Sequence, residues 1–272
     1  MSLFVASLNS GSNGNCYYVG NAQEAVLVDA GISCREMERR MRRLGLNLSK
    51  VKAIFISHEH GDHIRGVEIL SRRYQVPVYI TEKTLGYTKV DPSLVNHFGA
   101  HDSIKIGGLA VKAFPKFHDA VDPHSFTISY SGITVGVFTD IGAYCSNVIE
   151  HFRKCHACFL ETNYDEAMLE TGRYPYHLKN RIRGGHGHLS NRQALELFMQ
   201  YKPDFMTHLF LSHLSRDNND PLLAYDLFAA ENHKVQIVVA SRYNESEVYY
   251  ITGIEEKVKL PPRIKAVQAT LF

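Results

Sequence analysis

The segment "SHEHGDH", which begins at Ser57, constrains this chain more than any other stretch of its sequence. It follows the apolar run "VKAIFI", which predicts a buried strand, and leads into "HIRGVEILSRRY", which predicts a helix. On extended backbone His58 and His60 project to the same side, and Asp62 and His63 follow at the turn. Imidazole nitrogens and carboxylate oxygens bind zinc and manganese. The segment therefore predicts a metal site at a strand end; the alternative is a polar loop whose histidines are solvated.

Other candidate ligands also follow predicted strands. His118 comes after "VKAFPKF", Asp140 after "ITVGVFT" and His213 after "MTHLFLS". Any one of these side chains alone is typical of a surface or a core, but their shared position at strand ends favours metal ligation. The turn "NSGSNGN", residues 9–15, either lines the mouth of the site with backbone amides or serves only as a tight turn.

The order of the predicted elements indicates a mixed α/β (α+β) chain. Short strands separated by Gly, Ser and Asn turns come first, and strands and helices then mix through both halves, so helices are expected to cover two sheets. The basic stretch from Arg173 to Arg183 is predicted to be irregular, and Ser190 with Gln193 forms a capping box before the helix "RQALELFMQ". With 272 residues, 44% of them hydrophobic, we expect one domain over residues 1–260 and a tail over residues 261–272.

Composition excludes several classes of protein. The 30 basic and 28 acidic side chains nearly cancel, so net charge predicts neither a nucleic-acid partner nor a membrane surface. No apolar run approaches the ~20 residues of a membrane span, and the first residues do not read as a signal peptide. The five cysteines are odd in number and scattered, which argues against a disulfide framework. We expect a cytoplasmic protein without a membrane partner, in which Cys155 and Cys158 are structural thiols rather than metal ligands or a redox pair.

These segments together resemble the metallo-beta-lactamase-fold hydrolases, whose metal signature is H-x-H-x-D-H. The resemblance spans nearly the whole chain and implies a four-layer αββα sandwich over the hydrolase domain. It also implies two divalent ions, zinc or manganese, with the ligands His58, His60, Asp62, His63, His118, Asp140 and His213. Asp140 would bridge an ion held by His58, His60 and His118 and a second ion held by Asp62, His63 and His213. Asp29, in "AVLVDAG", matches the first motif of the family and either braces the metal loop or caps a turn.

The combination of "NSGSNGN", "VDAG", "SHEHGDH", "FTDIG" and "GHLSN" is similar to the WalJ/YycJ branch of this family, whose members are regarded as nucleases or their close relatives. Glu161 in "ETNYD" and His188 in "GHLSN" are also similar to a proton-handling pair in transfer-RNA 3'-processing endonucleases of this fold. The second similarity implies that His188, oriented by Glu161, protonates the leaving oxygen, and the metal-site residues permit Asp62 to orient the attacking water. The alternative is an ordinary strand-end acid and a helix-entry histidine.

The basic stretch bears on which bond is cut. Lys179, Arg181 and Arg183 lie near Tyr174 and Tyr176, with no acid among them. Cations interleaved with aromatic rings suit a phosphate backbone and stacked bases, although a solvated loop has a similar composition. We therefore expect these three cations to bind nucleic acid. We expect the chain to be a phosphodiesterase or nuclease, and specifically a DNA exonuclease. Two alternatives stay open: a metal-dependent hydrolase of a small ester, thioester or lactone, and a metal-dependent binding or regulatory protein without turnover.

The chain ends in "QATLF", Gln268–Phe272. This peptide resembles the short glutamine-to-Leu-Phe segment by which bacterial DNA enzymes dock on the replication sliding clamp. A sliding-clamp partner is therefore expected here; the alternative is an apolar tail that folds onto its own domain.

Overall fold

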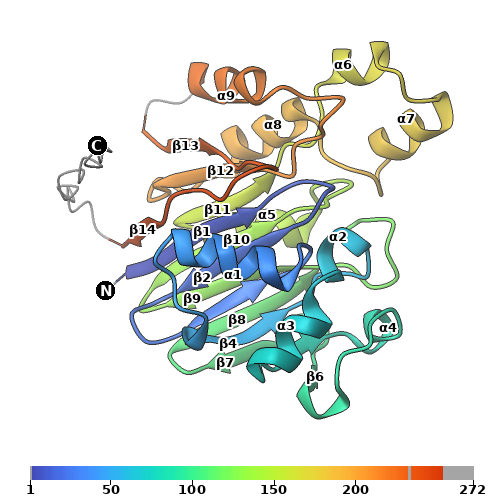
Figure 1. The fold of residues 1–272 in the computed structure, drawn as a ribbon. Coiled ribbons are helices and arrows are strands. Elements are labelled where there is room, and N and C mark those ends of the chain that lie inside the picture. Colours follow the sequence, from blue (N-terminus) through green and yellow to red (C-terminus); the bar gives the residue numbers. More distant parts are fainter. Residues whose placement is uncertain (1, 232–233, 254–272) are drawn as a thin grey trace, which may run out of the picture.

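The computed structural model describes residues 2–231 and 234–253, and its strands form two seven-stranded sheets (Figure 1). The first sheet has the order β14-β1-β2-β3-β4-β5-β6, and the second has the order β13-β12-β11-β10-β9-β8-β7. The strands of the first sheet are β1 (Ser2–Asn9), β2 (Cys16–Gly20), β3 (Ala25–Val28), β4 (Val51–Phe55), β5 (Val78–Ile80), β6 (Val95–His97) and β14 (Tyr249–Thr252). Those of the second are β7 (Ser103–Ile106), β8 (Leu109–Pro115), β9 (His124–Tyr130), β10 (Ile133–Phe138), β11 (Ala157–Glu161), β12 (His208–Ser212) and β13 (Gln236–Val239).

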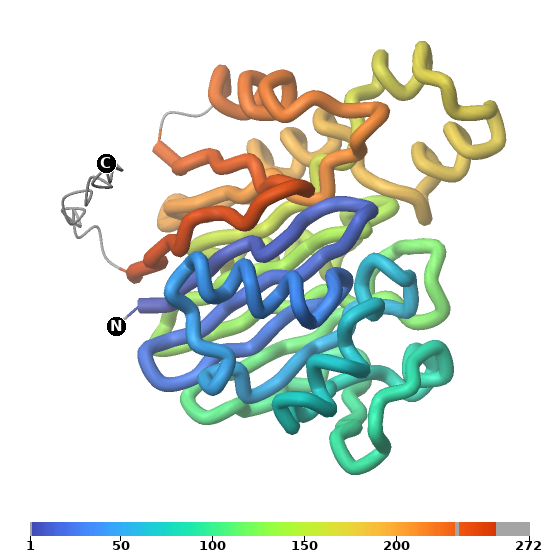
Figure 2. The backbone as a smooth tube through the Cα atoms, viewed as in Figure 1, coloured from blue at the N-terminus to red at the C-terminus, as the bar shows by residue number. Residues whose placement is uncertain are grey.

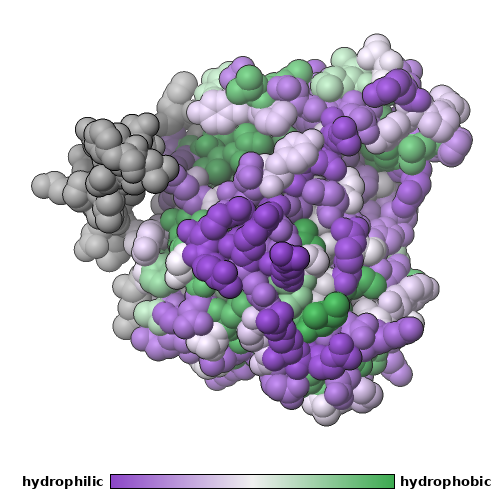
Figure 3. Space-filling model, viewed as in Figure 1, coloured by the Kyte–Doolittle hydropathy of each residue, from purple (hydrophilic) through white to green (hydrophobic). Residues whose placement is uncertain are grey.

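Helices cover the outer faces of both sheets. The helices of the described residues are α1 (Cys34–Arg43), α2 (Gly61–Ile64), α3 (Val67–Tyr74), α4 (Glu82–Leu85), α5 (Ser146–Phe152), α6 (Glu166–Thr171), α7 (Tyr176–Arg183), α8 (Asn191–Tyr201) and α9 (Pro221–Ala230), with 3₁₀ turns at Leu48–Lys50 and Pro92–Leu94. Buried side chains of α1 and α3 join one apolar core with the first sheet, and those of α5, α8 and α9 join another with the second sheet. The surface that α1 turns to solvent is hydrophilic (Figure 3). The predicted four-layer αββα sandwich is confirmed.

Strand β4 explains why the run before the metal loop is apolar without interruption. Ala53 and Phe55 project into the core between the two sheets, whereas Ile54 and Ile56 project into the core under α1 and α3. Successive side chains of a strand point to opposite faces, and both faces of this strand are covered.

Parallel pairing positions the site. Strands β3 to β6 run parallel to one another, as do β10 to β13. At the other end of the first sheet β14 pairs with β1, so the two ends of the described chain lie side by side (Figure 2). The carboxyl ends of parallel strands share one edge of a sheet, where open α/β sheets bind their ligands. Residues that directly follow β3, β4, β10, β11 and β12 therefore meet at this edge.

Two expectations about helices were wrong in part. The basic stretch is not irregular, because α7 occupies Tyr176–Arg183 after Pro175. Lys179 and Arg183 donate hydrogen bonds to Glu170. Because Glu170 precedes the basic stretch, the composition of the stretch alone gave no sign of these contacts. The single helix expected after the metal loop is two helices, α2 and α3. The capping box at Ser190 and Gln193 is present as predicted.

In the described part of the chain, no helix is long and apolar enough to cross a membrane. The expected domain boundary after residue 260 and the peptide Gln268–Phe272 lie outside the described residues.

Candidate metal centre

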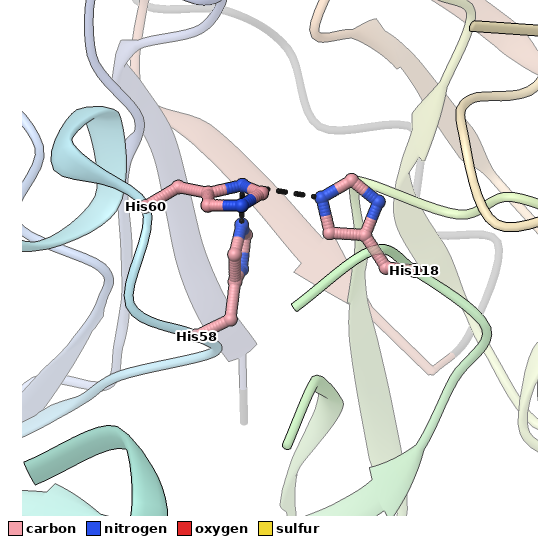
Figure 4. Close-up of side chains that lie close together, drawn as sticks. All are labelled: His58, His60 and His118. Carbon is pink, nitrogen blue, oxygen red and sulfur yellow. Dashed lines mark hydrogen bonds between the residues drawn. The ribbon is translucent and has the colours of Figure 1, made fainter. Parts of the chain in front are cut away.

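Three imidazoles from two segments converge at the edge described above (Figure 4). His58 and His60 follow β4, and His118 follows β8. His58 Nε2 lies 3.1 Å from His60 Nδ1, which lies 3.4 Å from His118 Nε2. Two nitrogens bound to one tetrahedral zinc ion at ~2.0–2.1 Å lie ~3.3 Å apart. The spacing of these three side chains therefore suits a single metal ion.

A second group forms beside the first. Asp62 Oδ2 lies 3.6 Å from His63 Nε2 and 3.7 Å from His213 Nε2. Asp140 stands between the two groups, because its Oδ2 lies 3.1 Å from His63 Nε2 and its Oδ1 lies 3.7 Å from His118 Nε2. The structure thus brings together all seven side chains of the predicted ligand set, in the two groups that the family resemblance implied.

Glu161 and His188 also lie at the site. Glu161 is fully buried at the end of β11, and its Oε1 lies 2.9 Å from His188 Nδ1 and 2.8 Å from His213 Nδ1. Its Oε2 accepts hydrogen bonds from the backbone N–H groups of Ile141 and Leu189. The sequence-based hypothesis paired Glu161 with His188 alone. The carboxylate also holds His213, which leaves His213 Nε2 directed at the second group.

Asp29 contacts two residues of the metal loop, Ser57 and His63. Its carboxylate accepts hydrogen bonds from the N–H and hydroxyl of Ser57, both at 2.8 Å, and lies 2.7 Å from His63 Nδ1. An acceptor on Nδ1 leaves Nε2 as the metal-binding nitrogen. Of the two interpretations of Asp29, the geometry favours bracing of the loop.

Asn15 is a site residue that sequence reasoning missed. Its side-chain amide nitrogen lies 3.2 Å from Asp62 Oδ2 and 3.1 Å from His63 Nε2, and its backbone N–H donates to Asp62 O at 2.7 Å. The turn that ends at Asn15 was recognised, but nothing local indicates that one of its side chains reaches a loop 47 residues further along.

Three residues of the site have left-handed backbone. The φ angles of Asp29, Asp140 and His213 are 61°, 55° and 57°. Residues other than Gly adopt the left-handed region at an energetic cost, and such residues are concentrated at functional sites. Each of the three lies just beyond the end of a strand, β3, β10 or β12, where the left-handed conformation ends the extended backbone.

Burial and charge set the protonation of the imidazoles. Burial lowers the pKa of His58 well below its usual range and that of His118 to about 4, so both rings are neutral, as metal ligation requires. Burial acts in the same direction on His213, but the carboxylates of Asp140, Asp62 and Glu161 outweigh it and raise its pKa to about 10. The buried carboxylates of the site thus favour positive charge at the second group.

The donor set fits divalent metal ions. Asp140 Oδ2 and His213 Nε2 are buried and make no hydrogen bond within residues 2–231 and 234–253. The ligand atoms of each group lie within 4.8 Å of one another; the first group offers three imidazole nitrogens, and the second combines imidazole nitrogens with a carboxylate oxygen. The cluster indicates binding of divalent metal. None of the clustered ligand groups in the described residues includes a cysteine, and Cys155 and Cys158 lie buried in the core under α5 and α8.

The three predicted substrate-binding cations lie on α7. Lys179 donates a hydrogen bond to Glu170 O, and Arg183 pairs with the Glu170 carboxylate at 3.0 Å. Arg181 pairs with Asp119, the residue after His118, and its side chain is 60% exposed. Arg181 is therefore linked to the metal centre through Asp119, whose Oδ1 lies 3.4 Å from His118 Nε2.

The fold and this site define the chain as a metallo-beta-lactamase-fold protein. A family model described as the beta-lactamase superfamily domain matches residues 24–213. The chain therefore belongs to the beta-lactamase superfamily, and the prediction of a metal-dependent hydrolase is confirmed.

Similar proteins span most of the chain. The exodeoxyribonuclease YycJ of Bacillus anthracis is 35% identical over 231 residues, which cover 82% of this chain and 87% of that protein. The exodeoxyribonuclease WalJ of Streptococcus pneumoniae is 32% identical over 227 residues, with coverage of 80% and 84%. The crystal structure of the metallo-beta-lactamase fold protein YhfI from Bacillus subtilis has a TM-score of 0.69 and 16% identity, covering 92% of this chain and 100% of that chain.

Proposed function

We propose that this chain is a dinuclear metal-dependent exodeoxyribonuclease that hydrolyses phosphodiester bonds of DNA. The observation that carries the proposal is a carboxylate, Asp140, placed between two convergent ligand groups. Similarity to YycJ and WalJ across most of the chain supports DNA as the substrate. We propose two ions per chain, zinc or manganese, held by the seven side chains of the two groups.

The chain's own residues would divide the chemistry. Two bound divalent ions supply Lewis acidity, which activates water and stabilises charge on phosphoryl oxygens. Asp62 would orient the attacking water, since its Oδ2 is fixed by Asn15. His188 would protonate the leaving oxygen, because its side chain is 21% exposed while its Nδ1 is held by the buried Glu161.

Metal content can be measured without activity. Dialysis against zinc or manganese should load about two ions per chain, and metal at 100-fold its Kd should raise the free energy of unfolding by about 2.7 kcal/mol. His213→Ala should lose at least one ion because it removes a buried ligand of the second group, whereas His177→Ala, an exposed histidine of α7, should lose none. Elemental analysis and thermal unfolding with and without chelator provide the measurement. Equal metal content in both variants would contradict the assigned ligands.

An exposed aromatic ring beside the site supports a nucleic-acid substrate. The side chain of Phe117 is 49% exposed although it directly precedes His118, and its ring centroid lies 5.6 Å from that of His186. Its backbone is fixed, because its carbonyl accepts the N–H of Gly142 at 2.6 Å. A fixed, exposed ring next to a metal ligand suits the stacking of an unpaired base.

Phe117→Ala should therefore weaken binding of single-stranded DNA by about 1–3 kcal/mol. Phe205→Ala is the matched control, since Phe205 is 48% exposed and its ring also contacts a histidine, His156, but it lies before β12 at the opposite edge of the sheet. Fluorescence anisotropy of a labelled oligonucleotide measures both affinities. If both variants bind like the parent, the ring takes no part in binding.

The test of function is to offer labelled single- and double-stranded DNA and RNA to protein loaded with zinc or manganese. Stepwise shortening of DNA is expected, with Asp62→Ala inactive and with binding that weakens steeply as salt rises. Hydrolysis of small esters, thioesters or lactones, indifferent to salt, would favour the first alternative. Intact nucleic acid that binds without product would favour the regulatory alternative. Equal cleavage by Asp62→Ala would reveal a contaminating nuclease.

We further propose that α7 contacts the phosphate backbone, with Arg181 foremost because of its position beside Asp119. Sliding-clamp docking through Gln268–Phe272 and a cytoplasmic location stay predictions.

A further inference from the structure

A pocket of about 310 Å³ lies beside the metal centre. Leu214 and Ser215, which follow β12, form one side, and Ala240 and Arg242, which follow β13, form the other. Its volume is at the lower end of the range of small-ligand sites. No step of the proposed hydrolysis uses this pocket.

The pocket is joined to the metal centre through Ser10. The Ser10 hydroxyl accepts the backbone N–H of His213 at 2.7 Å, and the Ser10 N–H donates to Ser241 O at 3.1 Å. Strands β12 and β13 are parallel neighbours with Leu211 opposite Val239. Adjacent strands are ~4.8 Å apart, so the pocket lies one strand further along the edge that carries His213.

Arg242 contributes a guanidinium to the lining of the pocket. Its Nη1 is buried and makes no hydrogen bond to any residue that the structure describes. A buried donor without an acceptor is costly, and a guanidinium binds phosphate oxygens in a planar, bidentate geometry. Arg216 adds a second, exposed cation to the lining.

The rest of the lining suits a nucleoside. Leu214, Val239 and Ala240 provide apolar surface, and the Tyr243 ring, 64% exposed, stands beside Arg242 at its edge. An aromatic face of this kind stacks a base. Asp220 is the acid of the lining, but its Oδ1 accepts the N–H groups of the first turn of α9, where the helix dipole stabilises its charge.

Hydrogen bonds hold the wall that carries Arg242 and Tyr243. The Asn13 side-chain amide donates to Arg242 O at 2.7 Å, and the buried Arg40 donates to Tyr243 O at 2.8 Å. Arg43 forms a bidentate ion pair with Glu245, with both N–O distances at 2.6 Å. A wall held in this way loses little entropy when a ligand binds.

We propose that this pocket binds the terminal nucleotide of a DNA strand, with its phosphate on Arg242 and its base against Tyr243. The proposal rests on the proposed nuclease function and adds to it the recognition of a strand end. A strand end seated one strand away from the metal centre would present a bond close to that end for hydrolysis, which is the property that separates an exonuclease from an endonuclease.

The first test is binding of thymidine 5'-monophosphate to protein kept metal-free with chelator, measured by calorimetry. The parent should bind the monophosphate at least tenfold more tightly than thymidine. Arg242→Gln should lose about tenfold in affinity, and Tyr243→Ala should weaken binding of both ligands. The matched control is Arg153→Gln, because Arg153 also stands over a tyrosine ring, that of Tyr201, but lines no part of this pocket. Absence of monophosphate binding by the parent, or equal binding by Arg242→Gln, would overturn the proposal.

The second test compares linear with circular single-stranded DNA. The metal-loaded parent should degrade linear DNA at least 100-fold faster, and Arg242→Gln should raise KM for linear DNA about tenfold while kcat changes less. Equal degradation of the two forms by the parent would overturn the pocket as a strand-end site but leave the nuclease function standing. If the parent degrades neither form, the proposed function fails, and the binding of the monophosphate still decides whether the pocket takes a nucleotide.

Discussion

Replacement of Asp140 by Asn is expected to lower the rate of DNA hydrolysis by about 10³-fold or more while the fold is retained. Metal ions contribute several kcal/mol of transition-state stabilisation, and each 1.36 kcal/mol is tenfold in rate. Asp140 is the carboxylate that faces both ligand groups, so loss of its charge weakens both. Asn has the same shape and tolerates the left-handed conformation that Asp140 adopts, with φ 55°. Single-turnover cleavage and thermal unfolding of the variant measure the two parts of this prediction.

A matched exchange is available at Asp165. This residue caps α6 by accepting the N–H of Met168 at 2.9 Å, a role that Asn fills equally well. Asp165→Asn should retain the parent's rate and metal content. A full rate in Asp140→Asn would rule out a bridging role for Asp140.

Gly31→Ala is expected to destabilise the protein by about 3 kcal/mol or more and to remove metal binding. A Cβ at Gly31 would lie 1.6 Å from Asp62 O and 2.6 Å from Asn15 N. These backbone atoms are themselves joined by hydrogen bonds, since Gly31 N donates to Asn15 O and Asn15 N donates to Asp62 O. The added methyl group can be accommodated only if the metal loop moves, and this movement displaces the metal ligands that the loop carries. Denaturant unfolding and metal analysis provide the measurement.

The control for this variant lies in the same loop. A Cβ at Gly61 would meet no atom within 4 Å, and Gly61 is the first residue of α2. Ala at a helical position is favoured over Gly by about 0.5–1 kcal/mol, so Gly61→Ala should be neutral or slightly stabilising. Equal stability and metal content in Gly31→Ala and Gly61→Ala would mean that the loop tolerates displacement.

Local sequence patterns identified the cations of α7 but not the residues with which they form ion pairs. Their presence is plain in the sequence, but the partners that hold them are not. Arg181 pairs with Asp119, 62 residues earlier, and Arg183 pairs with Glu170, which precedes the basic stretch. A stretch without acids therefore suggested a more open surface than the folded chain has.

The sequence by itself determined the layered fold and the set of candidate ligands. The two-residue period of strands and the strand-to-helix turn after Phe55 decide locally which side chains project and where each strand ends, so His58, His60, Asp62 and His63 could be identified from spacing alone. Tertiary structure alone decided how the site is held: the left-handed backbone of Asp140, the contact of Asn15 with Asp62, and the shared hold of Glu161 on two histidines. The pocket at Arg242 belongs to the same class, because its link to the metal centre joins Ser10 to His213 across 203 residues. Such contacts depend on strand register and on the packing of two sheets, and no local period in the sequence reports either of them.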